Sequence, residues 1–133
     1  MKLKRILNPI KRVFHRYEEW EDYQAGMYDE IREGRDTRIQ MAKSLLGNPA
    51  LCDKFMREVV KRWKCACEQV FTNPAINRRS WLGQAACCLY AGVKENETRE
   101  AWWLLTDEER NTANEIAEKV IKEYEEAHEQ NSI

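Results

Sequence analysis

The sequence predicts an all-α protein, a single-domain bundle of five to six helices that covers residues 1–133. The 133-residue chain is 34% charged and 43% hydrophobic, with only 5 Gly and 3 Pro, a composition that favours helices over a β-sandwich or barrel. Apolar residues recur every three or four positions along much of the chain, which is the period of a helix face. No segment alternates apolar and polar residues for long enough to form a strand. The prediction leaves room for a flexible basic arm at 1–8 and a tail at 129–133.

Three Asn-Pro pairs mark helix starts. Asn is a favourable N-cap, and Pro suits the first helical position because its φ is already set and its missing N–H is not needed there. The residue before Pro is also disfavoured in the helical region, as a cap requires. We therefore expect helices to begin near residues 9, 49 and 74. The pairs are Asn8-Pro9, Asn48-Pro49 and Asn73-Pro74.

The first half of the chain then divides into three predicted helices. One runs through about 9–31, with Gly26 as its weak point, and a shorter one ends at Gly47. The third, after Pro49, has the strongest apolar periodicity in the chain and extends to about residue 70. Its predicted inward residues are Cys52, Phe55, Met56, Val59, Val60, Trp63, Cys67 and Val70. Those of the shorter helix are Ile39, Ala42, Leu45 and Leu46.

The second half contains three more helices. One covers about 75–91 and stops at Gly92, a common C-terminal signal, and the segment ENETREAWWLL (95–105) forms a short helix. Thr106 and Glu109 form a capping box that starts the last helix. In the 75–91 helix, the small residues of LGQAACC predict a close helix crossing, with Trp81, Ala85, Cys88 and Leu89 on the packing face. The last helix turns Ile116, Val120, Ile121 and Tyr124 inward.

The five cysteines are predicted to be structural free thiols, with Cys52 and Cys67 on the apolar face of their helix, and no metal or cofactor is expected. Zinc requires four converging ligands, usually in pairs separated by two to four residues. Here one pair is Cys-Ala-Cys and the other is Cys-Cys, both within predicted helices, where such neighbours point about 200° and 100° apart. Metal binding and a redox or nucleophilic role remain the alternatives. The residues are Cys52, Cys65, Cys67, Cys87 and Cys88.

The net charge of −1 conceals strong local asymmetry. Residues 53–79 carry seven bases and three acids, whereas 94–129 carry twelve acids and five bases. A basic stripe lies opposite the apolar face of the helix that follows Pro49, and such a stripe can bind nucleic-acid phosphates. A solvated face paired with the acidic segments is the more common explanation. The stripe consists of Lys54, Arg57, Lys61 and Lys64.

A partner-binding surface is predicted around the short helix at 95–105. Adjacent Trp102 and Trp103 diverge by about 100° on a helix, so a domain of this size covers one ring more easily than both. A partly buried tryptophan is a typical interface anchor. Trp81, Arg78 and Arg79 are the expected neighbours of this surface, and self-association through it is a further alternative. In the competing interpretation both rings are buried in the bundle.

Enzymatic chemistry is not expected. The chain has no Gly-rich phosphate loop and no order of residues typical of a catalytic triad, and its two histidines lie near the ends. No catalytic residue is therefore predicted. No apolar run approaches the length of a membrane span, and the N-terminus lacks the apolar core and cleavage site of a signal peptide. We expect a cytoplasmic protein.

Two segments resemble an uncharacterised family of small helical proteins encoded by bacteriophages, prophages and other bacterial mobile elements. They are CEQVFTNPAINRRSWLGQAACCLYAGV (67–93) and LLTDEERNTANEIAEKVI (104–121), and EEWEDYQAGMY (18–28) is similar to the family's opening segment. The likeness covers most of 17–124, and INRRSWLGQA is its most specific part. It implies an accessory role in the bacterial host cytosol. By analogy with other small phage proteins of this build, the role is the binding of a host or phage protein, and components of defence machinery are among such partners. The alternative is a nucleic-acid-binding accessory protein that uses the basic stripe.

Overall fold

The structure is a computed structural model that describes residues 34–132, with side chains as far as Glu129. The chain divides into two compact units, residues 1–36 and residues 37–133, and the helices labelled below belong to the second unit. The described part of the chain is helical and contains no strand, which confirms the all-α prediction. The predicted arm at 1–8 and helix at 9–31 lie outside the described residues. The single-domain assignment for 1–133 stays a prediction.

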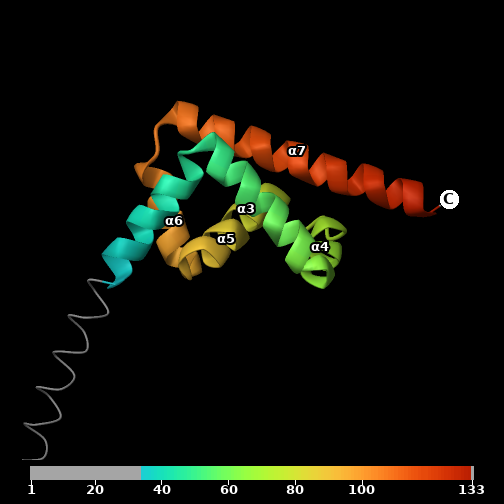
Figure 1. The fold of residues 1–133 in the computed structure, drawn as a ribbon, viewed down its shortest axis with the longest axis horizontal. Coiled ribbons are helices and arrows are strands. Elements are labelled where there is room, and N and C mark those ends of the chain that lie inside the picture. Colours follow the sequence, from blue (N-terminus) through green and yellow to red (C-terminus); the bar gives the residue numbers. More distant parts are fainter. Residues whose placement is uncertain (1–33, 133) are drawn as a thin grey trace, which may run out of the picture. The chain divides into compact units, whose positions relative to one another are not determined.

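Three helices form the centre of the fold, because α3, α5 and α7 each contact the other two. α4 packs on α3 and α5, and α6 packs on α5. The long α7 runs beside α3 and extends to the C-terminal end of the chain (Figure 1), so the predicted tail is helical as far as Ser132. A helix through residues 34–46 precedes the labelled elements. The others are α3 (Pro49–Arg62), α4 (Lys64–Phe71), α5 (Arg78–Ala91), α6 (Glu95–Leu104) and α7 (Asp107–Ser132).

Two of the Asn-Pro pairs lie in the described region, and they behave differently. Asn48 caps α3 as predicted, with its side-chain oxygen accepting from the Leu51 N–H at 3.2 Å. The prediction of a helix start near Pro74 was wrong. Asn73 instead closes a turn, accepting from the Ala75 N–H at 3.0 Å, and α5 begins only after Asn77, which accepts from the Ser80 N–H at 3.2 Å. A second capping residue close by therefore sets the helix start.

The predicted continuous helix from 49 to about 70 is interrupted at Trp63, which has φ −112° and ψ 52°. No Pro or Gly causes the break. The turn redirects α4 so that Cys67, Val70 and Phe71 are buried, while the Cys67 thiol lies 3.9 Å from the Val59 carbonyl oxygen. Burial of this apolar face by tertiary packing outweighs the continuity of one helix. The predicted apolar residues are inward, but they lie on two helices.

The buried face of α5 differs from the predicted one, because Cys88 is exposed and Cys87 is fully buried. α5 packs against both α3 and α7, so its small residues are covered from two sides and the buried face is centred on them. Gly92 ends the helix in the left-handed conformation with φ 64°, as predicted. The buried residues of α5 are Leu82, Gly83, Ala85, Ala86 and Cys87.

The turn after residue 46 contacts the start of α7. The predicted capping box is present: Thr106 N–H donates to Glu109 Oε1 at 2.9 Å, and Glu109 N–H donates to Thr106 Oγ1 at 3.1 Å. The other oxygen of Glu109 lies against Gly47, where an added Cβ would be 2.6 Å from it and 3.1 Å from the Lys43 carbonyl oxygen. A side chain at position 47 would therefore displace the Glu109 carboxylate from its present place. We call this contact between Gly47 and Glu109 the joint between the turn and the start of α7.

Candidate functional site

The start of α6 is fixed by Glu97, whose side chain is only 2% exposed. Arg38 Nε donates to both carboxylate oxygens, at 3.0 Å and 2.8 Å, and the Lys94 N–H donates to Oε1 at 3.3 Å. Burial alone would raise the pKa of Glu97 and is the largest single influence, but the hydrogen bonds and positive charges of Arg38 and Lys94 together outweigh it. The pKa of Glu97 is consequently held below its usual range. One carboxylate thus joins α6 to the helix at 34–46.

The end of α6 is held by Arg110, from the first turn of α7. Its Nη1 donates to the Leu105 carbonyl at 2.9 Å and to the Trp102 carbonyl at 3.4 Å, which satisfies carbonyls at a helix end. Arg110 also contacts the Asp107 carboxylate. Its guanidinium lies 5.4 Å from the centroid of the Trp103 ring, within the range of a cation–π contact. Arg110 therefore both ends the helix and orients Trp103.

The last turn of α6 exposes two large apolar side chains to solvent. Trp103 is 69% exposed and Leu104 is 52% exposed, although Ala101 and Leu105 beside them are buried. Among the described residues, Ile76 is the other large hydrophobic side chain with substantial exposure, at 37%. The exposed apolar surface of this part of the chain is therefore concentrated at the end of α6. We call Trp103 and Leu104 the α6 edge.

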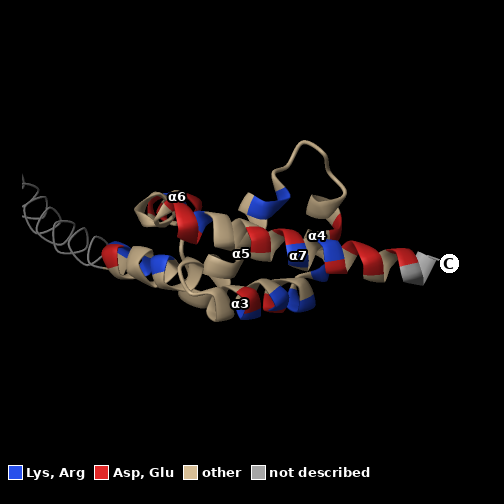
Figure 2. Cartoon of the chain, turned by 90° about the horizontal axis from the view of Figure 1, so that it is seen from above, with Lys and Arg blue, Asp and Glu red and all other residues tan. Residues whose placement is uncertain are grey.

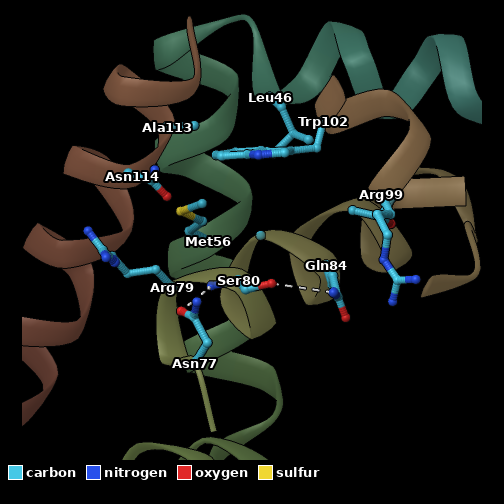
Figure 3. Close-up of a pocket in the computed structure, with 12 residues that line it drawn as sticks. Leu46, Met56, Asn77, Arg79, Ser80, Gln84, Arg99, Trp102, Ala113 and Asn114 are labelled. Atoms are coloured by element: carbon cyan, nitrogen blue, oxygen red, sulfur yellow. Dashed lines mark hydrogen bonds between the residues drawn. The ribbon is translucent and has the colours of Figure 1, made fainter. Parts of the chain in front are cut away.

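Trp102 points the other way, into a cavity of about 240 Å³ that is lined by α3, α5, α6, α7 and the end of the helix at 34–46. Figure 3 shows its ring edge-on along one side of the cavity, with Ser80 and Gln84 across from it and Arg79 beside Asn114. The indole is half-buried and packs against the core. Adjacent tryptophans thus lie in different environments, one lining a cavity and the other in solvent.

The predicted partner-binding residues do not all meet in one place. Arg79 lines the same cavity as Trp102, and its Nε lies 3.5 Å from Glu118. Trp81 instead packs edge-on against Phe71, with ring centroids 5.9 Å apart. Arg78 contacts Glu125 and points its Nη1 at the Phe71 carbonyl oxygen, 3.5 Å away. Trp81 and Arg78 therefore take part in the packing of α4, α5 and α7.

The four residues of the basic stripe are exposed, but the stripe is partly neutralised. Arg57 Nε lies 2.8 Å from Asp53, and its Nη1 contacts Glu123 of α7. Acidic and basic residues are mixed along α3, whereas acidic residues predominate along α7 (Figure 2). Lys61 and Lys64 border a groove between α3, α4 and the second half of α7, and neither forms an ion pair with any residue that the structure describes. Lys54 lies 6.0 Å from the Phe55 ring centroid.

Three of the five cysteines are buried, namely Cys52, Cys67 and Cys87, and two are exposed. Burial is the main cause that raises the thiol pKa of Cys52 and of Cys87 to about 12 and that of Cys67 to about 11. Over residues 34–129, no three His, Cys, Asp or Glu side chains gather as metal ligands would. The prediction that Cys52 and Cys67 belong to the apolar face is confirmed.

Comparisons of the chain with protein-family models, with curated proteins and with solved structures gave no significant match. Within the described part of the chain, no helix is both long and apolar enough to cross a membrane.

Sequence reasoning did not identify the polar residues that line the cavity. Asn77, Ser80 and Gln84 are spaced by three and four residues, so they share one face of α5, next to Gly83. Asn114 joins them from α7. The spacing of these three residues is visible in the sequence. Tertiary packing decides which helices lie across the cavity from them.

Proposed function

We propose that this protein is a non-enzymatic accessory protein of a phage or mobile element, and that it acts by binding a host or phage protein through the α6 edge. The observation that carries the proposal is the 69% exposure of Trp103, next to Leu104 at 52%. Tryptophan supplies a large contact area with few rotatable bonds and is enriched among residues that dominate binding energy. The resemblance to mobile-element proteins supports the accessory role.

The α6 edge is also preorganised. Arg110 holds the carbonyl groups of the last turn and lies 5.4 Å from the Trp103 ring centroid, so the ring has a preferred orientation before any partner arrives. An oriented anchor loses less conformational entropy on binding than a mobile one. Glu108 and Asp107, the latter in contact with Arg110, are exposed nearby in sequence. These carboxylates favour a partner surface that combines an apolar pocket with basic residues.

The test is affinity purification from the bacterial host with identification of the bound proteins. We expect one protein to be captured by the wild type and lost with Trp103→Ala and Leu104→Ala. Ile76→Ala is the matched control, because it also truncates an exposed apolar side chain but lies in the turn before α5. Capture of the same proteins by all variants, with helix content unchanged, would contradict the proposal.

Nucleic-acid binding through the basic stripe is the second candidate, and the exposure of Lys61 and Lys64 supports it. The pairing of Arg57 with both Asp53 and Glu123 weakens it, because two carboxylates already neutralise this guanidinium and a phosphate would have to displace them. A binding assay with DNA and RNA at several salt concentrations separates the two candidates. Affinity that falls steeply with salt and is lost in Lys61→Glu would favour nucleic acid.

A further inference from the structure

The cavity beside Trp102 has the size and shape of a small-ligand site. Its volume of about 240 Å³ exceeds the roughly 150 Å³ in which an apolar cavity of a protein core binds benzene. One or two fused rings therefore fit. The Trp102 ring lies along one side (Figure 3), and Leu46, Met56 and Ala113 add apolar lining. A flat ring can stack on the indole face.

The polar lining is rich in hydrogen-bond donors and contains no acidic side chain. Asn77 and Ser80 bring the first turn of α5, which has no acidic residue to offset the helix dipole, so this end of the cavity favours a negative charge. Arg79 also lines it. The existing partner of Arg79 is Glu118, at 3.5 Å, and the two side chains are 46% and 61% exposed. Exposed pairs of this kind contribute little, so an incoming anion can replace Glu118.

The geometry points to a binding site for a small planar anion, a molecule of one or two fused aromatic rings that carries a carboxylate or a phosphate. Its ring stacks on Trp102, and its anionic group lies at the start of α5 near Arg79. The site is separate from the α6 edge, because Trp102 and Trp103 point in different directions. The two assignments can therefore fail independently.

The test uses indole-3-acetate and AMP as probes, which distinguish an aromatic acid from a nucleotide, with indole as the uncharged analogue. Binding to the full chain is followed by the backbone amide NMR signals of Ser80, Gly83 and Gln84. We expect saturable shifts of these signals with at least one anionic probe. The proposal would be overturned if neither probe produced saturable shifts up to about 10 mM. Such a result would mean a binding free energy weaker than about −3 kcal/mol.

Variants test the two halves of the site. Arg79→Gln should weaken binding of the anionic probe about tenfold or more and leave indole binding unchanged, and Trp102→Leu should weaken both. Gly83→Val should block the cavity, since the nearest side-chain atom to an added Cβ is 3.9 Å away and the larger side chain extends into the open space. Arg62→Gln on α3 is the control. Unchanged binding in Arg79→Gln and Gly83→Val, both with wild-type helix content, would overturn the site even if Trp102→Leu fails to fold.

Discussion

Arg38 and Glu97 are 59 positions apart in the sequence, yet Nε of Arg38 donates to both oxygens of the Glu97 carboxylate, at 3.0 Å and 2.8 Å. The two ends of this contact are not equally buried, because the Arg38 side chain is 29% exposed and that of Glu97 is 2% exposed. Removing the arginine would leave a buried carboxylate, whereas removing the charge of Glu97 would leave an arginine that water can reach. The pair should therefore respond asymmetrically to mutation.

We expect Arg38→Met to lower the free energy of unfolding by about 3 kcal/mol, the usual cost of leaving a buried charge without its partner. Glu97→Gln should cost less, about 1–2 kcal/mol, because the amide can still accept from Arg38 and from the Lys94 N–H. The double variant should cost less than the sum of the two. Urea unfolding followed by circular dichroism measures all three. A larger loss for Glu97→Gln than for Arg38→Met would contradict the asymmetry.

The same carboxylate predicts a dependence of stability on pH. The folded-state pKa of Glu97 is lowered, so its contribution is fully present above the unfolded-state pKa of about 4.3 and is lost as the pH falls towards the lower folded-state pKa. Unfolding free energies should therefore decrease below about pH 4. Glu109 and Glu123, whose pKa values are also lowered, add to this loss. Glu97→Gln should show a smaller decrease than the wild type over the same range.

Native thiol reactivity should divide the cysteines into two classes. Cys65 and Cys88 are exposed and should react quickly with a disulfide reagent, whereas Cys52, Cys67 and Cys87 are buried and have raised pKa values. The thiolate is the reactive form, so the second class should react only when the protein opens. Mass spectrometry after brief labelling should find two modifications, and five in denaturant. More than two in the folded protein would contradict the burial.

Gly83→Ala should stabilise the protein. Gly83 lies inside α5 without a positive φ, and an added Cβ would have its nearest neighbour, Leu46 Cδ2, at 3.9 Å. Alanine in a helix interior is favoured over glycine by about 0.5–1 kcal/mol. Thermal unfolding should therefore shift upward. Gly92→Ala is the contrasting variant, because its φ of 64° makes the same substitution destabilising.

The two asparagines before α5 should contribute unequally to the free energy of unfolding. Asn77→Ala removes the side chain that caps the helix and should cost about 1 kcal/mol. Asn73→Ala removes a hydrogen bond within the preceding turn and should cost less, because this bond satisfies no N–H group of a helix. Comparing the urea midpoints of the two variants measures the difference. Equal losses would mean that the turn and the helix start form a single unit.

Local signals in the sequence predicted most helix boundaries of the described part. Asn48, Gly92 and the Thr106–Glu109 box act over three or four residues, so their effect can be seen without knowledge of the fold. The break at Trp63 and the inward position of Cys87 could not be seen, because both depend on which helices lie against α4 and α5. For the same reason, the sequence pointed to Trp102 and Trp103 together, but it could not show that only one of them faces a cavity.

The joint between Gly47 and Glu109 has a consequence for how related sequences can diverge. One oxygen of the Glu109 carboxylate serves the start of α7, and the other occupies the space that a side chain at position 47 would need. The two positions should therefore change together during evolution. Glycine at 47 should be favoured where a long acidic or amide side chain at 109 caps α7, and an alanine at 47 should be accompanied by a shorter residue at 109, such as serine or aspartate, or by a shifted side chain there. An alignment in which the two positions vary independently would show that the joint can be rebuilt in other ways.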